Sequence, residues 1–332
     1  MIMNFLKRIP AGIMIVPMLL ASLINTFIPE VVQIGSFTTA IFTSAGAATA
    51  IGIQLFCLGT TLQLREMPRV FKRGGILLMS KFVIGAIIGI SIGKIFGMGG
   101  VLGLTTLAVI SAVTNSNGSV YLALMNTYGD ETDSAAMALL AINDGPFLTL
   151  VALGASGLAN IPLISLVAAV VPIVVGMILG NIDRSLKDFL APAGNILIPF
   201  VGFTLGAGIN ITNIVRGGPQ GILLGLISTF VGGAFIVACD RFIGKRPGYA
   251  GWAVATTAGN AVAVPAAVAI IDPAWQPYVG TATTQVAAAV VVTAILVPLM
   301  TDWWVKKHGS PKYPLKRNEE GIKKAEVSME FD

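Results

Sequence analysis

Histidine and cysteine are almost absent from this chain of 332 residues, which contains one His and two Cys. His308 lies in a charged C-terminal segment, so a His-based metal site and a Ser-His-Asp triad are excluded. Cys57 and Cys239 fall in apolar segments, which predicts core packing rather than a disulfide framework. No Walker or Rossmann glycine pattern appears between a strand and a helix. The sequence therefore predicts no enzyme, no cofactor and no ATPase subunit.

Charge is scarce as well. Only 11% of the residues are charged, against about 25% in a typical soluble domain. Hydrophobic residues make up 55% of the chain, and its mean hydropathy is +0.84. A soluble fold of this length needs far less apolar surface, so the expected partner is a lipid bilayer and not a nucleic acid.

Apolar stretches long enough to cross a membrane recur along the chain, since a span of about 30 Å takes roughly 20 helical residues. Lys7 and Arg8 before the first stretch resemble a signal peptide, but Pro10, Pro17 and the lack of a small-residue cleavage site favour a retained helix. The sequence predicts an all-α integral membrane protein with ten transmembrane helices, at about 10–28, 41–63, 75–97, 101–127, 134–157, 162–180, 194–212, 219–239, 250–271 and 276–301.

The placement of positive charge predicts the orientation. With a cytoplasmic N-terminus, ten spans return the C-terminus to the cytoplasm. All but three of the 21 Lys and Arg then lie in cytoplasmic segments, the exceptions being Lys94 and Arg216 outside and Lys81 within a span. This is the bias of the positive-inside rule, and it also explains the net charge of +5.

The second half of the chain repeats features of the first. Phe56–Leu64 matches Phe203–Ile211, Gly75–Leu78 matches Gly221–Leu224, and Thr114 and Asn117 line up with Thr257 and Asn260, all at nearly the same offset. These matches predict two five-helix repeats. Five is odd, so the second repeat is inverted relative to the first. The predicted divisions are 1–160 and 161–303 for the repeats and 304–332 for a polar cytoplasmic tail.

Polar residues interrupt the fourth and the ninth predicted helix near their middles. Unpaired backbone groups at that depth are tolerated only where protein or a cavity surrounds them. Two broken helices that meet would present N–H groups and positive dipole ends to one point, a seat suited to a carboxylate. The predicted substrate-binding residues are Thr114, Asn115, Ser116, Asn117, Gly118, Ser119, Thr256, Thr257, Gly259, Asn260 and, on the tenth helix, Gln285.

Two charges fall inside predicted spans. Asp144 lies in the middle of 134–157, where an aspartate costs about 2.5–3.5 kcal/mol, which favours a proton carrier over a structural carboxylate that caps a kink or bonds to Asn143. Lys81 lies six residues into its span, so its side chain either snorkels to the cytoplasmic interface or attracts an anion or pairs with Asp144. We take Asp144, Asn143 and Lys81 as candidates for proton or ion coupling.

Several motifs resemble those of 2-keto-3-deoxygluconate permeases, over roughly 8–303. They are Ile9–Pro17, Asn117–Tyr121 followed by Tyr128-Gly129, Asp144-Gly145-Pro146, Ile198-Pro199-Phe200 with Leu205-Gly206, and Ile295–Pro298.

The resemblance implies a proton symporter that imports 2-keto-3-deoxygluconate, a small sugar-acid anion, across the bacterial inner membrane. It also implies the fold of the bile, arsenite and riboflavin transporter superfamily, in which a core domain with crossing broken helices moves against a panel domain. Some members carry an acid in the first break and a Glu in the fifth helix, where this chain has Thr114 and Asn143. The acid here stands one residue later, at Asp144, and one residue turns a helix by about 100°.

Two alternatives stay open at this point. The same fold could couple to sodium, with Asn115, Asn117, Asn260 and Gln285 supplying oxygen ligands. The same cavity could also serve a passive channel or a sensor for small carboxylates.

Overall fold

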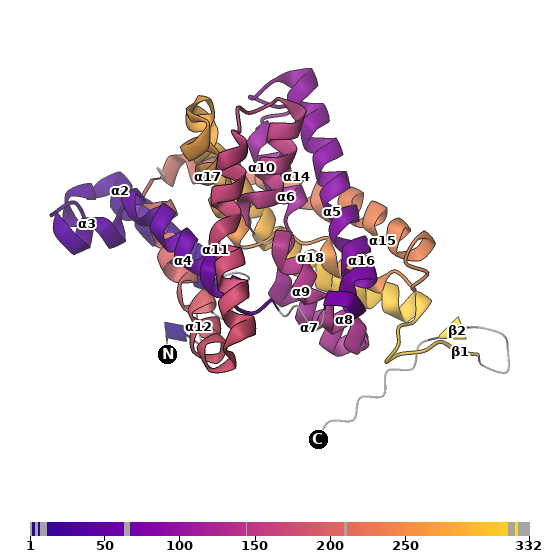
Figure 1. Cartoon of the computed structure of the whole chain (residues 1–332). Coiled ribbons are helices and arrows are strands. Elements are labelled where there is room, and N and C mark those ends of the chain that lie inside the picture. The colour runs from indigo at the N-terminus through magenta and orange to yellow at the C-terminus, as the bar shows by residue number, and fades with distance from the viewer. Residues whose placement is uncertain are drawn as a thin grey trace.

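The chain folds almost entirely into helices (Figure 1). The structure, a computed structural model, describes residues 2–3, 6, 12–62, 67–143, 145–208, 211–317 and 323–324. Its strands within that part are β1 (Lys316–Arg317) and β2 (Lys323–Lys324), which pair antiparallel near the C-terminus. The predicted all-helical class is confirmed for the membrane region.

Helices follow one another closely along the first half of the chain. In order they are α2 (Gly12–Phe27), η1 (Pro29–Val31), α3 (Ser36–Phe42), η2 (Ser44–Gly46), α4 (Ala47–Gly59), α5 (Met67–Phe96), α6 (Thr106–Thr114), α7 (Gly118–Tyr128), α8 (Glu131–Ala135), α9 (Met137–Leu140), η3 (Ala141–Asn143) and α10 (Pro146–Ser156).

The second half has the same character, and η4 is a π-helical segment. Its elements are α11 (Leu163–Ile182), α12 (Arg184–Ile196), α13 (Ile198–Gly206), α14 (Ile211–Leu226), η4 (Ile227–Gly232), α15 (Gly233–Phe242), α16 (Tyr249–Val254), η5 (Asn260–Ala263), α17 (Val264–Ile271), η6 (Pro273–Tyr278) and α18 (Val279–His308). Figure 1 shows α2 and α3 at one edge, α15 toward the other, and α6 and α10 between them.

Several helices are long and apolar enough to cross a membrane. By length and composition, the described residues contain three such helices, or up to five if each of two bent pairs is one span. The other predicted spans coincide with shorter or interrupted helices. A membrane protein is therefore indicated, and the number of ten spans stays a prediction. The three helices are Phe71–Phe96, Gly218–Phe242 and Pro273–His308.

Glycine spacing brings α5 against α6. Gly85, Gly89 and Gly93 share one face of α5 because they are four residues apart. A Cβ at Gly85 would lie 2.7 Å from the backbone nitrogen of Thr114, and one at Gly89 would lie 2.7 Å from the Cβ of Ile110. The missing side chains let α5 pack directly on the helix that leads into the first break.

The structure extends two predicted boundaries. α5 begins at Met67 rather than near residue 75, which adds about two helical turns before Lys81. α18 continues to His308, past the boundary proposed at 304. The residues that follow also pack on the protein, since Lys312 donates its N–H to the carbonyl of Tyr128 and the Tyr313 ring lies 5.7 Å from the Tyr128 ring.

Candidate functional site at the two helix breaks

The first break separates α6 from α7. Thr114 ends α6, and Asn115 and Asn117 adopt extended backbone conformations. The Asn117 side chain then caps α7, because its Oδ1 accepts the N–H of Val120 at 3.0 Å, the usual role of Asn at a helix N-terminus. Thr114, Asn115 and Ser116 are buried. The predicted interruption is therefore present, with its polar groups inside the protein.

The second break separates α16 from η5 and α17. α16 ends at Val254, and buried Thr256 and Thr257 follow it. Gly259 and Asn260 are half-buried, and the Asn260 amide makes no hydrogen bond within the described part of the chain. Pro265 fits the first turn of α17, where its missing N–H costs nothing.

The two breaks touch each other. The backbone N–H of Asn117 donates to Thr256 Oγ1 at 2.8 Å, and Thr257 Oγ1 donates to the carbonyl of Ala112 at 3.3 Å. Segments about 140 residues apart in the chain therefore satisfy each other's free backbone groups. The N-terminal ends of α7 and of η5 lie at this contact, which we call the crossing.

The first break is also bonded to the fifth predicted span, which has an unforeseen break of its own between η3 and α10. Asn115 Oδ1 accepts the N–H of Gly145 at 3.0 Å, and Asn143 Oδ1 accepts the hydroxyl of Ser116 at 2.9 Å. Asp144 itself lies outside the described residues, and both of its chain neighbours bond to the first break. Asn115 and Asn143 are therefore engaged in holding the backbone of the crossing.

A matching pair of threonine contacts supports each break. Thr114 Oγ1 lies 2.8 Å from Thr149 Oγ1, 35 residues further along the chain. Thr293 Oγ1 accepts the N–H of Thr257 at 2.9 Å, from a position 36 residues further along. The sequence analysis did not single out Thr149 and Thr293. The signal that could have found them is their nearly equal distance along the chain from the two breaks.

Lys81 points into the crossing. Its side chain is fully buried, and Nζ donates to the carbonyl of Thr256 at 2.8 Å and to Ser228 Oγ at 3.4 Å. The snorkelling alternative is wrong, because the Lys81 ammonium has no exposed surface and is hydrogen-bonded inside the protein. Lys81 forms no ion pair with any carboxylate of the described residues.

Ser228 was missed by the sequence analysis. It lies in the π-helical η4, a distortion often found at functional sites. Its separation from Lys81 is 147 residues, which is also the offset between the repeated Phe56 and Phe203 motifs. Nearby positions of α6 and η4 add buried hydroxyls without a partner in the described part of the chain, those of Ser111 and Thr229.

Not every predicted residue lies at the crossing. Gln285 binds the opposite end of α6, where its Oε1 accepts the N–H of Thr105 at 3.1 Å and its Nε2 donates to the carbonyl of Gly103 at 2.6 Å. Gly118 starts α7 against the end of the Met137 side chain. Ser119 follows in the first turn of α7, and its side chain lies outside the described part.

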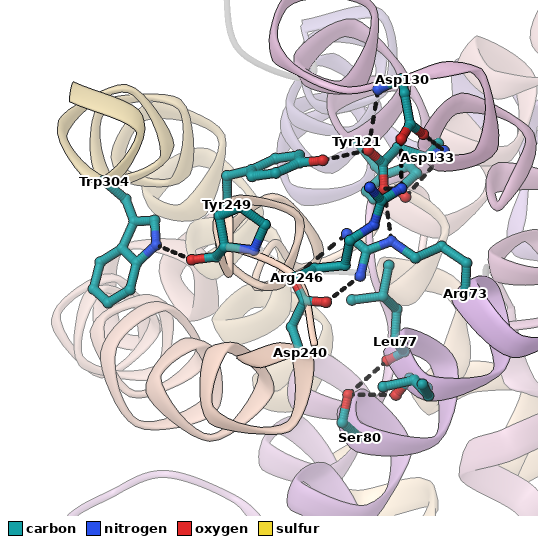
Figure 2. A network of polar contacts seen from close by, with 12 residues as sticks. Arg73, Leu77, Ser80, Tyr121, Asp130, Asp133, Asp240, Arg246, Tyr249 and Trp304 are labelled. Carbon is teal, nitrogen blue, oxygen red and sulfur yellow. Dashed lines mark hydrogen bonds and ion pairs between the residues drawn. The ribbon is translucent and has the colours of Figure 1, made fainter. Parts of the chain in front are cut away.

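A buried ionic cluster at one end of the same helices was also missed (Figure 2). Arg73 on α5 lies between Asp133 and Asp240, and it donates to Asp133 Oδ1 at 2.6 Å and also to Asp240. The hydroxyl of Tyr249 donates to Asp133 as well. Both carboxylates are fully buried, although the sequence placed them at the ends of spans.

The rim of this cluster is more exposed. Arg246 donates to Asp130 Oδ2 at 2.5 Å, and Asp130 caps α8 by accepting the N–H of Asp133. Partial burial acts to raise the pKa of the Asp130 carboxyl, but the Arg246 hydrogen bond and the N–H of Asp133 outweigh it and lower the pKa. The cluster therefore joins the start of α5, the α7–α8 turn, the end of α15 and the α15–α16 turn.

Comparisons with known proteins agree on one family. A family model described as 2-keto-3-deoxygluconate permease matches residues 3–310. The chain is 47% identical over 302 residues to 2-keto-3-deoxygluconate permease 1 of Salmonella typhimurium, covering 91% of this chain and 95% of that protein. The identity is 38% over 307 residues with the permease of Xanthomonas axonopodis pv. citri, and 36% over 308 residues with that of Bacillus subtilis. Coverage is 91% of this chain in both, with 96% and 93% of those proteins.

These relatives are named as permeases and not as enzymes, which agrees with the absence of catalytic motifs from the sequence. The match spans both breaks and the helices around them. The chain belongs to the 2-keto-3-deoxygluconate permease family.

Proposed function

We propose that this protein is a secondary active transporter that imports 2-keto-3-deoxygluconate by proton symport across the bacterial inner membrane, with both termini in the cytoplasm. The observation that carries the proposal is the contact between the two breaks, where Asn117 N–H meets Thr256 Oγ1 beside the buried ammonium of Lys81. The names of the relatives support the choice of substrate.

The chemistry of the crossing suits a hydroxylated monocarboxylate. Lys81 supplies a positive charge, and the N-terminal ends of α7 and η5 add partial positive charge. Thr257 and the amide of Asn260 offer neutral hydrogen-bonding groups for hydroxyls. A sugar acid therefore has a partner here for its carboxylate and for its alcohol groups.

Helix packing supports an alternating-access movement of a core against a panel. α2 packs on α13, and α4 packs on α11 and α12. α5 packs on α6, and α14 and α16 pack on α18. The first group corresponds to spans one, two, six and seven, and the second to spans three, four, eight, nine and ten. In our proposal, each of the two inverted repeats, 1–160 and 161–303, contributes helices to both bodies.

Proton coupling needs an intramembrane group that gains and loses a proton, and Asp144 and Lys81 are the candidates. The sodium alternative has less support. Three of the oxygens proposed as ligands already accept a backbone N–H, namely those of Asn115, Asn117 and Gln285. No cofactor is part of the proposal.

The test is uptake of labelled sugar acids by proteoliposomes that contain the full chain. An inward proton gradient is expected to drive accumulation of 2-keto-3-deoxygluconate above its external concentration. Uptake that follows a sodium gradient and ignores pH would support the sodium alternative. Flux without accumulation would indicate a channel, and binding without flux would indicate a sensor.

A pair of substitutions tests the crossing itself. Asn260→Ala removes an amide that no described residue uses, so we expect about tenfold weaker binding, the value of one hydrogen bond to a charged or polar ligand. Asn117→Ser keeps a helix cap and serves as the partner variant in the first break. The control is Asn160→Ala, an exposed position outside the crossing. Unchanged affinity in Asn260→Ala and Asn117→Ser would exclude this location for the substrate.

A further inference from the structure

The Lys81 ammonium has only neutral partners among the described residues. Its Nζ contacts the carbonyl of Thr256 at 2.8 Å and the hydroxyl of Ser228 at 3.4 Å, and the side chain has no exposed surface. Buried charges in proteins are normally paired, because an isolated ammonium in a medium of low polarity gives up its proton instead. The described surroundings of Lys81 therefore supply no negative group, and they favour its charged form only when one is added.

The elements packed against α5 supply no such group from the described residues. α6, α9, α10 and η4 contain no ionisable side chain. The helices α8, α15 and α16 also contact α5, and they do contain ionisable residues. Their buried carboxylates, Asp133 and Asp240, bind Arg73, which lies eight residues and about 12 Å before Lys81 on α5. Asp144 lies outside the described residues. The ionisable residues of α8, α15 and α16 are Glu131, Asp133, Cys239, Asp240, Arg241 and Tyr249, and Lys81 hydrogen-bonds to none of them.

We propose that Lys81 carries the coupling proton, which it holds only while the carboxylate of the substrate lies beside it at the crossing. This inference rests on the proposed function and names the group that links proton to substrate. An ammonium has three N–H donors, and the two contacts above leave one for the carboxylate. A proton from the external water joins the Nζ lone pair as the anion binds. After the anion leaves to the cytoplasm, the same proton passes to cytoplasmic water.

Electrostatics sets the strength of this linkage. In the proposed complex, two opposite unit charges lie about 4 Å apart, in surroundings with an effective dielectric constant of about 20. Their attraction corresponds to a roughly 10³-fold higher affinity for the anion when Lys81 is protonated. Because linkage is reciprocal, the anion raises the proton affinity of Lys81 by the same factor. Binding of either species without the other is then disfavoured, which prevents a leak of either one.

The direct measurement is the proton uptake that follows substrate addition. Weakly buffered, detergent-solubilised protein is mixed with saturating 2-keto-3-deoxygluconate between pH 6 and 9, and the pH change is recorded. We expect uptake of about one proton per wild-type molecule at the alkaline end of this range. If wild-type protein binds the substrate but takes up no proton at any pH, the inference is overturned, and no variant is needed to reach that result.

Lys81→Arg identifies the group, since a guanidinium stays protonated in proteins. This variant is expected to bind and exchange labelled substrate, to take up no proton on binding, and to lose accumulation driven by a pH gradient. The matched control is Lys94→Arg, the same substitution at an exposed position of α5, which should behave as the wild type. Lys81→Met is a second variant, and it is expected to bind at least 100-fold more weakly with no proton uptake.

Asp144→Asn separates the two candidate carriers. Proton uptake that persists in Asp144→Asn and disappears in Lys81→Arg supports Lys81. The reverse pattern assigns the proton to Asp144 and overturns the inference, while the proposed function stands. Failure of the wild type to take up any sugar acid contradicts the proposed function itself.

Discussion

At the scale of single residues, the structure separates positions that hold the crossing together from positions that are free to bind. Asn115 has both ends of its amide engaged by Ser111, Thr149 and Gly145. Asn260 has no described partner. The sequence treated these two Asn residues alike, because an amide in an apolar stretch looks the same whether protein or ligand satisfies it.

Arg73 is the residue on which the buried ionic cluster depends. Arg73→Met would leave Asp133 and Asp240 buried without their cation, so we expect a loss of about 3–5 kcal/mol in the free energy of unfolding. Denaturant unfolding in detergent measures it. Adding Asp240→Asn should restore part of the loss, because one uncompensated charge is then removed.

The control for that experiment is an exposed ion pair of the same chain. Lys306 lies 2.7 Å from Asp302, and its side chain is 57% exposed. Lys306→Met should change stability by no more than about 0.5 kcal/mol. Equal effects of the two substitutions would contradict the structural role of Arg73.

Asp130 gives the stability of the protein a dependence on pH. Burial opposes the shift, but Arg246 and the N–H of Asp133 lower the pKa of the Asp130 carboxyl in the folded protein. The carboxylate therefore stabilises the fold at a pH above its unfolded pKa near 4, and this stabilisation is lost as the pH falls through the folded pKa. Asp130→Asn keeps a helix cap and removes the charge. We expect the variant to be about 0.2–1 kcal/mol less stable at pH 6, and the difference to shrink as the pH falls below the unfolded value near 4. A difference that stays constant as the pH falls would point to lost packing instead.

At the scale of elements, the interruptions of the fourth and ninth helices were predictable, because polar residues and Pro265 interrupt long apolar stretches there. The third break, before Pro146, was not foreseen beyond the kink that a capping Asp144 would imply. The π-helical η4 was not predictable. Its residues Ile227–Gly232 are ordinary helix formers for a membrane span, and its contacts with α18 and with the carbonyl of Ala255 come from distant parts of the chain.

The α5–α6 contact provides a test at this scale. Gly89→Ala places a Cβ 2.7 Å from the Cβ of Ile110, so overpacking of about 1–3 kcal/mol should outweigh the gain in helix propensity. Gly75→Ala on the same helix meets nothing closer than 3.8 Å and should be neutral or stabilising by up to about 1 kcal/mol. Thermal unfolding of both variants should therefore give shifts of opposite sign, and shifts of the same sign would contradict the packing described.

At the scale of the whole molecule, composition and charge placement were enough to predict a helical membrane protein. The buried cluster around Arg73 shows what they could not give. The predicted spans put Arg73, Asp133 and Asp240 in cytoplasmic segments. Their spacing in the sequence gives no sign that the three side chains meet inside the protein. The positive-inside rule describes where chains insert, and it does not describe which polar ends become buried afterwards.

The predicted orientation has a direct test. In a background of Cys57→Ala and Cys239→Ala, the variant Lys94→Cys should react with a membrane-impermeant maleimide in intact cells, because the predicted orientation puts residue 94 on the external side. The variant Lys316→Cys should react only after the membrane is opened, because the same prediction puts residue 316 in the cytoplasm. Equal labelling of the two positions in intact cells would exclude an odd number of crossings between them.

The contact between the breaks also has a consequence for synthesis of the protein. The N–H of Asn117 finds its acceptor on Thr256, 139 residues later. At about 5–20 residues per second, the ribosome needs on the order of ten seconds to deliver that acceptor. In the predicted topology, the first half spends this time in the membrane while the N–H of Asn117 lacks the acceptor that Thr256 later supplies. Truncated chains that end before residue 256 should therefore be degraded faster in cells than full-length chains.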